Sequence, residues 1–264
     1  ALAGDYFNDA ERTRFTSRQS MIMSIGSAAS ILVGGVLTDL DWRLSFLVYL
    51  AGWVVMLPVL AWIDEPKRHA VVQARDAGPR SPISIWLWVV YAVAFFGILM
   101  FYLIPVQIPF LLRQMEISSA TLAAVALGVA AITSAVSPLA YARLRRRLGF
   151  GGMYAVAFAL MGAGYLVVFL ATTYLAILLG LAVTGIGVGF FFPNNHLWML
   201  ALAPAHARGR LSGGLTSSIF LGQFFCPLLS YPLVAGVGLA GTFGVAAALL
   251  GAAAILLSRV KSTH

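Results

Sequence analysis

The sequence has little charge and almost no cysteine, and each shortage excludes a class of protein. Charged residues make up 10% of the 264 residues, whereas hydrophobic residues make up 61%. These fractions lie far outside the range of soluble globular domains. The single cysteine, Cys226, excludes an internal disulfide framework and a cysteine-rich metal site. The absence of a Gly-Lys phosphate-binding loop excludes an ATP-driven pump of that kind.

Charge is missing altogether from two long stretches. Residues 148–207 and 211–258 contain no Lys, Arg, Asp or Glu. About 20 apolar residues cross the roughly 30 Å hydrocarbon core of a bilayer. A helix satisfies its own backbone hydrogen bonds there, whereas an open sheet does not. The sequence therefore predicts an all-α, polytopic membrane helix bundle.

Turn and charge signals divide the chain into eight expected spans. They cover approximately residues 19–37, 44–63, 83–112, 120–142, 151–171, 174–203, 211–232 and 239–257. The polar segment 64–82 is rich in proline and glycine and is interpreted as a linker. We expect residues 1–63 to form the remainder of one half and residues 83–264 to form a six-helix half.

The basic residues sort by side of the membrane. The loops of one side hold Arg12, Arg14, Arg18, Lys67, Arg68, Arg75, Arg80, Arg143, Arg145, Arg146, Arg147, Arg208, Arg210, Arg259 and Lys261. The other side holds only Arg43 and Arg113. This bias predicts that the linker and both ends of the chain are cytoplasmic. Because topology explains the basic residues, we expect no nucleic-acid partner.

A weak repeat relates the two ends of the chain. Arg12, Arg14 and Gly26 recur 196 positions later as Arg208, Arg210 and Gly222. Each copy opens an apolar run and is followed by a turn and one more run. A repeat of this length is the size of a bundle half, and parallel halves are typical of secondary transporters.

Several segments resemble the major facilitator superfamily, whose fold has twelve spans in two six-helix halves joined by a cytoplasmic linker. Trp42, Arg43 and Phe46 match its WRxxF pattern, Glu65–Pro66 matches its EP, and SPLAYARLRRRLG is similar to its degenerate loop motif. The antiporter motif GxxxGPxxGG has a counterpart at Gly26, Ser30, Ile31, Gly34 and Gly35, which lacks one glycine and the proline. The resemblance covers essentially the whole chain and implies that about four upstream spans are missing.

The resemblance implies a secondary active transporter that works by alternating access. The expected activity is proton-linked efflux of small organic molecules, with antiporter character, in a bacterial cytoplasmic (inner) membrane. Uptake of metabolites or sugars is one alternative. A membrane scaffold or sensor without transport is another. The expected partners are a small-molecule substrate, the lipid bilayer and protons; oligomeric state stays open.

Two expected spans carry the candidate substrate cavity. At about 100° per residue, Thr184, Phe191, Asn195 and Trp198 fall within roughly 60° of one another. Resemblance places this span and the span of residues 83–112 around a central cavity with an amide anchor. The candidate cavity residues are Tyr91, Phe95, Tyr102, Thr184, Phe191, Asn195 and Gln223. Packing of aromatics between helices or against lipid is the alternative for these positions.

A second set of residues is expected to serve packing and conformational change. Gly26, Ser30 and Gly34 recur every fourth position, which lets another backbone approach closely. Pro193 removes a helical hydrogen bond and, with Gly185, Gly187 and Gly189, predicts an irregular span. The complete set is Gly26, Ser30, Gly34, Gly35, Pro193, Arg143, Arg208 and Arg210.

The distribution of titratable residues argues against an enzyme. None of the nine acids lies inside an expected span, although intramembrane acids are the usual proton relays. An acid that couples transport to protons would then lie in the missing spans, and His196 is the other candidate. The four histidines lack metal-ligand spacing. We therefore expect no catalytic residue, no metal and no cofactor.

Overall fold

The computed structural model describes residues 26, 29–50, 52, 56, 84–204 and 207–260. All regular structure in these residues is helical, which confirms the all-α prediction. The expected linker at residues 64–82 lies outside this range, as do the basic loop at 8–18 and the Glu65–Pro66 match. The chain forms two compact units: Ala1–Gly78 with Ser119–Val125, and Pro79–Ser118 with Ala126–His264. We call them unit 1 and unit 2.

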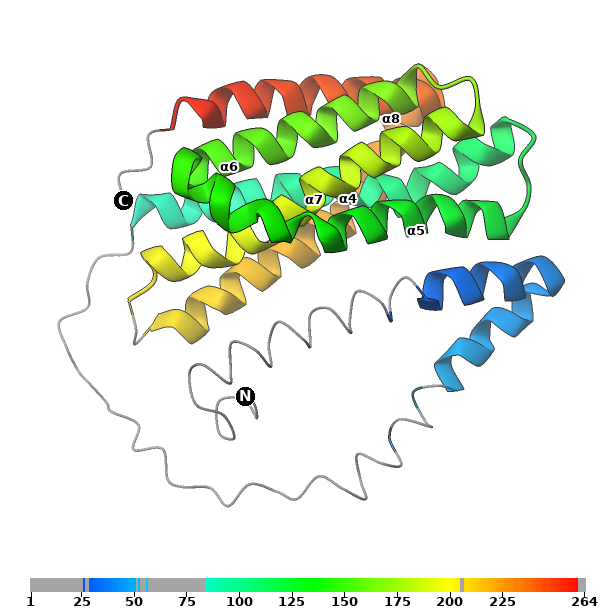
Figure 1. Cartoon of the computed structure of the whole chain (residues 1–264), viewed down its shortest axis with the longest axis horizontal. Coiled ribbons are helices and arrows are strands. Elements are labelled where there is room, and N and C mark those ends of the chain that lie inside the picture. The colour runs from blue at the N-terminus through cyan, green and yellow to red at the C-terminus, as the bar shows by residue number, and fades with distance from the viewer. Residues whose placement is uncertain are drawn as a thin grey trace. The chain divides into compact units, whose positions relative to one another are not determined.

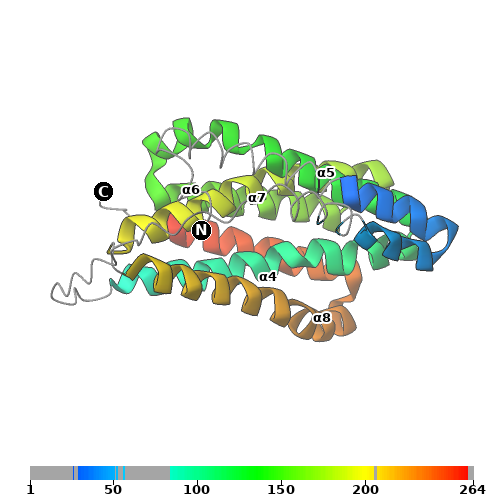
Figure 2. The same ribbon diagram turned by 90° about the horizontal axis from the view of Figure 1, so that it is seen from below.

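Five long apolar helices dominate the described residues (Figures 1 and 2). They are α4 (Ile85–Gln114), α5 (Ala120–Val136), α6 (Pro138–Phe169), α7 (Tyr174–Leu202) and α8 (Arg208–Ser258). Two of these helices are preceded by a residue whose side chain accepts a hydrogen bond from the first turn. Ser84 accepts from Trp86 N at the start of α4, and Thr173 accepts from Ala176 N at the start of α7. Such caps satisfy donors that a helix leaves unpaired in its first turn.

Two helices reverse direction at a glycine. Gly149 in α6 has φ 66° and ψ −172°, and Gly238 in α8 has φ 78° and ψ 172°. Glycine adopts a positive φ without the steric cost of a Cβ. In α8 the second limb runs back in the opposite direction from the first (Figure 1). The reversals fall within the turns expected at residues 143–150 and 233–238, but these turns are wrong in extent, because residues 143–148 and 233–237 continue the helices and one glycine makes each reversal. α8 therefore contains two apolar limbs.

One end of unit 2 gathers the basic residues. The starts of α4 and α8, the reversal of α6 and the ends of α7 and α8 lie together (Figures 1 and 2). The described arginines there are Arg143, Arg145, Arg146, Arg147, Arg208, Arg210 and Arg259. We call this the basic end. It agrees with the sorting of basic residues in the sequence.

α7 is continuous through Pro193, so the prediction of an irregular span there is wrong. The glycines before the proline serve close packing instead. A Cβ at Gly187 would lie 2.5 Å from Ala157 O of α6, and one at Gly189 would overlap Ser137 beside α5. Because two neighbouring helices hold these turns, the helix passes the proline without a break.

Large apolar side chains cover the outer surface of the helices. Leu139 is 83% exposed, Leu256 68% and Phe220 62%. A soluble protein rarely exposes apolar side chains over such an extent. With helices long enough to cross a bilayer, this surface identifies an integral membrane protein.

The described part of unit 1 holds a short apolar helix, Ala29–Leu40, and a 3-10 helix, η1 (Trp42–Tyr49). The turn between them is shorter than the expected turn at residues 38–43. Thr38 continues the first helix and donates to Gly34 O at 2.7 Å. Asp41 alone is non-helical, and its side chain accepts from Arg43 N at 2.8 Å. This cap explains how one residue suffices for the turn.

Candidate functional site

The candidate face of α7 packs on α6. Thr184, Phe191 and Asn195 are completely buried, and Trp198 is nearly so. Thr184 donates to Gly180 O and lies against Gly164 of α6. The four residues therefore share a face, as their spacing predicts, and in this structure it is an interhelical face.

Asn195 is the polar centre of this face. Its Oδ1 accepts a hydrogen bond from the Tyr154 hydroxyl of α6. Its Nδ2 is buried and has no hydrogen-bond partner among the described residues. A buried donor left unpaired costs about 1–3 kcal/mol. Such groups are rare in native structures and call for a specific reason.

Aromatic rings surround the Asn195 amide. Tyr154 lies 5.6 Å from Trp198 and 6.1 Å from Phe191, measured between ring centroids. Phe158 lies 5.8 Å from Phe191. Sequence reasoning found Phe191 and Trp198 but missed Tyr154 and Phe158, because contacts between α6 and α7 leave no periodic signal in either helix.

Both polar atoms of the neighbouring Asn194 side chain have hydrogen-bond partners. Its Oδ1 accepts from the Tyr141 hydroxyl at 2.8 Å, and its Nδ2 donates to Phe150 O at 3.1 Å. Tyr141 and Phe150 stand on either side of the reversal at Gly149. Asn194 therefore holds the two limbs of α6 together at the basic end. The sequence analysis did not single it out.

The candidates on α4 lie toward α8. Tyr91 donates to Leu211 O at 2.7 Å, and the Phe95 ring lies 6.2 Å from that of Phe225. Tyr102 and Gln223 are half-buried. These four residues and the α7 face are thus separate groups. Phe191 joins α7 closely to α4, because its ring fills the space beside Gly97. Two ring pairs, Trp86 with Trp198 and Phe101 with Phe192, also connect the two helices.

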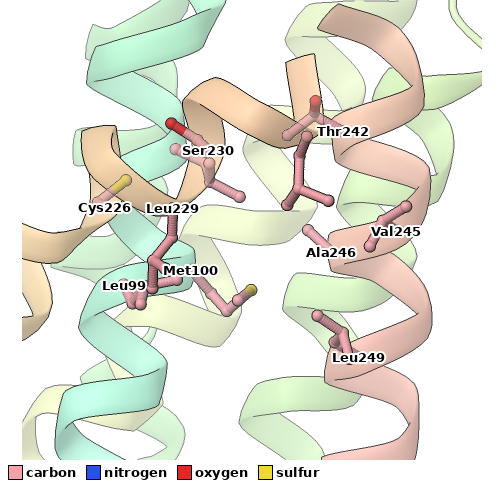
Figure 3. Close-up of a pocket in the computed structure, with 11 residues that line it drawn as sticks. Leu99, Met100, Cys226, Leu229, Ser230, Thr242, Val245, Ala246 and Leu249 are labelled. Atoms are coloured by element: carbon pink, nitrogen blue, oxygen red, sulfur yellow. The ribbon is translucent and has the colours of Figure 1, made fainter. Parts of the chain in front are cut away.

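A small cavity in unit 2 lies elsewhere. It has a volume of about 30 Å³ and is bordered by α4 and both limbs of α8 (Figure 3). Ser230, Thr242 and Cys226 contribute polar atoms to an otherwise apolar wall. Such a space holds about one water molecule. None of the predicted cavity residues lines it.

Gln107 is an unpredicted polar residue beside this cavity. It is buried in α4 between Pro105 and Pro109, and its Nε2 donates to Ser230 Oγ at 2.9 Å. The Ser230 hydroxyl donates in turn to Pro227 O at 3.4 Å. An amide inside an apolar span was the signal that singled out Gln223, and it applies equally to Gln107.

The residues expected to serve packing differ in their contacts with neighbouring helices. A Cβ at Gly35 would overlap Ala124 of α5, so these backbones approach closely. Gly26 and Gly34 meet nothing within 4 Å in the described residues, and Ser30 borders a shallow pocket beside η1. A packing role for these three stays a prediction. Of the other members, Arg143, Arg208 and Arg210 are exposed at the basic end, and Pro193 lies inside the continuous helix α7.

One turn beyond Gly35, Asp39 caps the first turn of α5 within unit 1. Its carboxylate accepts from the Ser119 hydroxyl at 2.7 Å, from Ala120 N, and from Thr121 N at 2.8 Å. Hydrogen bonds from Thr121, then from Ser119 and Ala120, hold the pKa of the carboxyl well below its usual range. The sequence analysis placed Asp39 in a turn and assigned it no role.

The described helices offer no acidic or metal-binding constellation. The carboxylates of the described residues are Asp39, Asp41 and Glu116, and no group of three potential metal ligands occurs among these residues. His196 is exposed, and its Nδ1 lies 3.2 Å from Phe192 O. The polar chemistry of the buried helices therefore comes from amides and hydroxyls.

Long apolar helices, glycine-mediated packing and a basic end together define an all-α, polytopic membrane protein. The family model described as Major Facilitator Superfamily matches residues 1–171 and residues 90–263. The chain belongs to this superfamily and is a membrane transporter. Comparisons with curated proteins and with solved structures found no match.

Proposed function

We propose that the chain carries out secondary active transport by alternating access, as proton-linked efflux of small organic molecules. Membership of the superfamily supports transport. The partial antiporter motif around Gly34 and Gly35 favours export. The proposed organisation is the remainder of one half at residues 1–63, a linker at 64–82 and a six-helix half at 83–264. The basic end faces the cytoplasm in this proposal, as the positive-inside bias favours.

The observation that carries substrate recognition is the unpaired donor of Asn195. A substrate shifts the equilibrium between two conformations only if it binds them with different free energies. A buried donor that is unpaired in one conformation and bonded to substrate in another would supply such a difference. A substrate with a hydrogen-bond acceptor and an apolar body fits an amide surrounded by Tyr154, Phe191 and Trp198. Tyr91, Phe95, Tyr102, Thr184 and Gln223 are proposed to contribute to the same transport path.

A pair of double variants in the intact protein tests this role. Asn195→Leu with Tyr154→Phe removes the amide together with its partner hydroxyl. Because no buried polar group is left unpaired, thermal stability in detergent should hold or rise. Apparent substrate affinity should fall five- to more than a hundredfold, as loss of a hydrogen bond worth about 1–3 kcal/mol implies.

The matched control uses the adjacent amide. Asn194→Leu with Tyr141→Phe removes a satisfied pair, so thermal stability should fall while the folded fraction keeps its substrate affinity. If the Asn195 pair leaves affinity unchanged over several substrates, Asn195 serves only packing between helices and the recognition proposal fails.

Direction and coupling are tested in proteoliposomes. Efflux coupled to protons requires that an imposed pH gradient drive substrate flux and that a protonophore abolish it. Flux into the compartment equivalent to the cytoplasm would favour the uptake alternative. Absence of flux with all common substrate classes would favour a scaffold or sensor.

A further inference from the structure

The reversal of α6 at the basic end presents an array of arginines. Arg143, Arg145, Arg146 and Arg147 precede Gly149, and we call this segment, residues 143–149, the basic turn. No carboxylate in the described part of the chain forms a salt bridge with any of them. Unpaired like charges repel one another, so a compact array of this kind favours an anion from outside the protein.

The basic turn is held in place by α7. Asn194 accepts from Tyr141 before the turn and donates to Phe150 O after it. The Arg145 guanidinium lies 4.3 Å from the centroid of the Phe150 ring. Phe150 in turn stacks on Trp198 at 5.6 Å with an interplanar angle of 5°. Topology alone requires that the arginines be on one side of the membrane; it does not require that they be anchored by a buried amide and an aromatic stack.

The end of α8 adds to the array. A Cβ at Gly151 would lie 2.6 Å from Val260 O, so the second limb of α6 touches the last residues of α8. Arg259 lies there and is exposed. The same turns carry exposed apolar side chains, Leu148 at 40% and Ile255 at 61%. Cationic and lipid-facing apolar groups are therefore adjacent.

We propose that the basic turn and Arg259 bind the phosphate of an anionic phospholipid, whose acyl chains lie along Leu148 and Ile255. Arginine is suited to phosphate because its guanidinium presents several donors in a planar fork. Basic clusters immediately beside a membrane span attract anionic lipid, at about 1 kcal/mol per residue. A nucleic acid or an acidic protein would leave the adjacent apolar surface unused, which favours lipid.

The test measures lipid selectivity in the intact protein. Nanodiscs containing phosphatidylglycerol and phosphatidylethanolamine in equal amounts are dissociated, and the lipids retained by the protein are counted by native mass spectrometry. Arg146→Gln with Arg147→Gln should weaken the preference for phosphatidylglycerol about thirtyfold, from two arginines at about 1 kcal/mol each. Both side chains are exposed, so the variant should fold normally.

Matched variants separate a site from general charge. Arg113→Gln, an exposed arginine at the opposite end of α4, should retain the preference. Arg146→Lys with Arg147→Lys should retain only part of it, because lysine keeps the charge but lacks the planar fork. An unchanged preference in the double glutamine variant would overturn the proposal, as would an equal loss in Arg113→Gln. Displacement of the lipid by excess inorganic phosphate would assign the site to a free anion and would also overturn it. Transport is not the readout, so this result is independent of the proposed function.

Discussion

The two neighbouring asparagines of α7 differ in the partners that α6 offers them. Asn194 meets a hydroxyl and a carbonyl, which satisfy its acceptor and its donor. Asn195 meets one hydroxyl, from Tyr154, and its donor has no partner in the part of the chain that the structure describes. A structural role explains Asn194 completely. The unpaired donor of Asn195 is what a purely structural role leaves unexplained.

The glycines of the described helices are of two kinds: at some, an added Cβ would contact a neighbouring helix, and at others it would contact nothing in the described part of the chain. Gly187→Ala should lower the free energy of unfolding by about 1–3 kcal/mol, because the new methyl would lie 2.5 Å from Ala157 O. Gly251 lies in the second limb of α8, and a Cβ there would meet no described residue within 4 Å. Gly251→Ala should be neutral or stabilising by up to about 1 kcal/mol. Thermal unfolding of the purified variants in detergent compares the two, and equal destabilisation would contradict the packing role.

At the scale of elements, helix ends are completed by residues distant in sequence. Asp39 ends the helix Ala29–Leu40 and supplies acceptors to the first turn of α5, about 80 positions later. A carboxylate is favourable at this place because the first turn of a helix has unpaired N–H groups and a partial positive charge. Gly35 allows the approach, since a Cβ there would overlap Ala124. One glycine and one acid thus join two helices.

The Asp39 cap should be insensitive to pH across the physiological range. Its pKa is depressed in the folded state, so the stabilisation is fully present above the ordinary Asp pKa of about 4 and is lost only as pH falls through the lower folded value. Hydrogen exchange of the peptide that includes Ala120 and Thr121 should show equal protection at about pH 5.5 and 7.5, after correction for intrinsic rates. Asp39→Ala should speed this exchange, and Glu116→Gln should not. Unchanged exchange in Asp39→Ala would show that the cap adds nothing.

At the scale of the whole molecule, charge is separated from apolar surface. The helices expose apolar side chains along their length, and the described arginines of unit 2, apart from Arg113, gather at the basic end. This distribution orients a membrane protein because basic loops are retained in the cytoplasm. The loop between α4 and α5, which carries Glu116, lies at the opposite end of unit 2 (Figure 1).

Single-cysteine probes check this orientation in a Cys226→Ser background of the intact protein. Arg146→Cys should react with an impermeant maleimide only after the membrane is opened, and Glu116→Cys should react in intact cells. Both residues are exposed, so accessibility reports sidedness rather than burial. Labelling of Arg146→Cys in intact cells would reverse the proposed topology.

Much of the architecture follows from the sequence alone. Charge-free runs predicted the helices, because a segment in lipid must satisfy its own backbone hydrogen bonds. Turn signals located the reversals near Gly149 and Gly238, where positive φ favours glycine. Periodicity placed Thr184, Phe191 and Asn195 on one face, because the helical repeat is a local property.

Only the tertiary structure decided what that face meets. α7 is continuous through Pro193, and its glycines are packed against other helices, which no local rule anticipates. The partners of Asn194 and Asn195 come from α6, and those of Asp39 come from the start of α5. Hydrogen bonds between helices depend on how the helices pack, so they leave no periodic trace in the sequence.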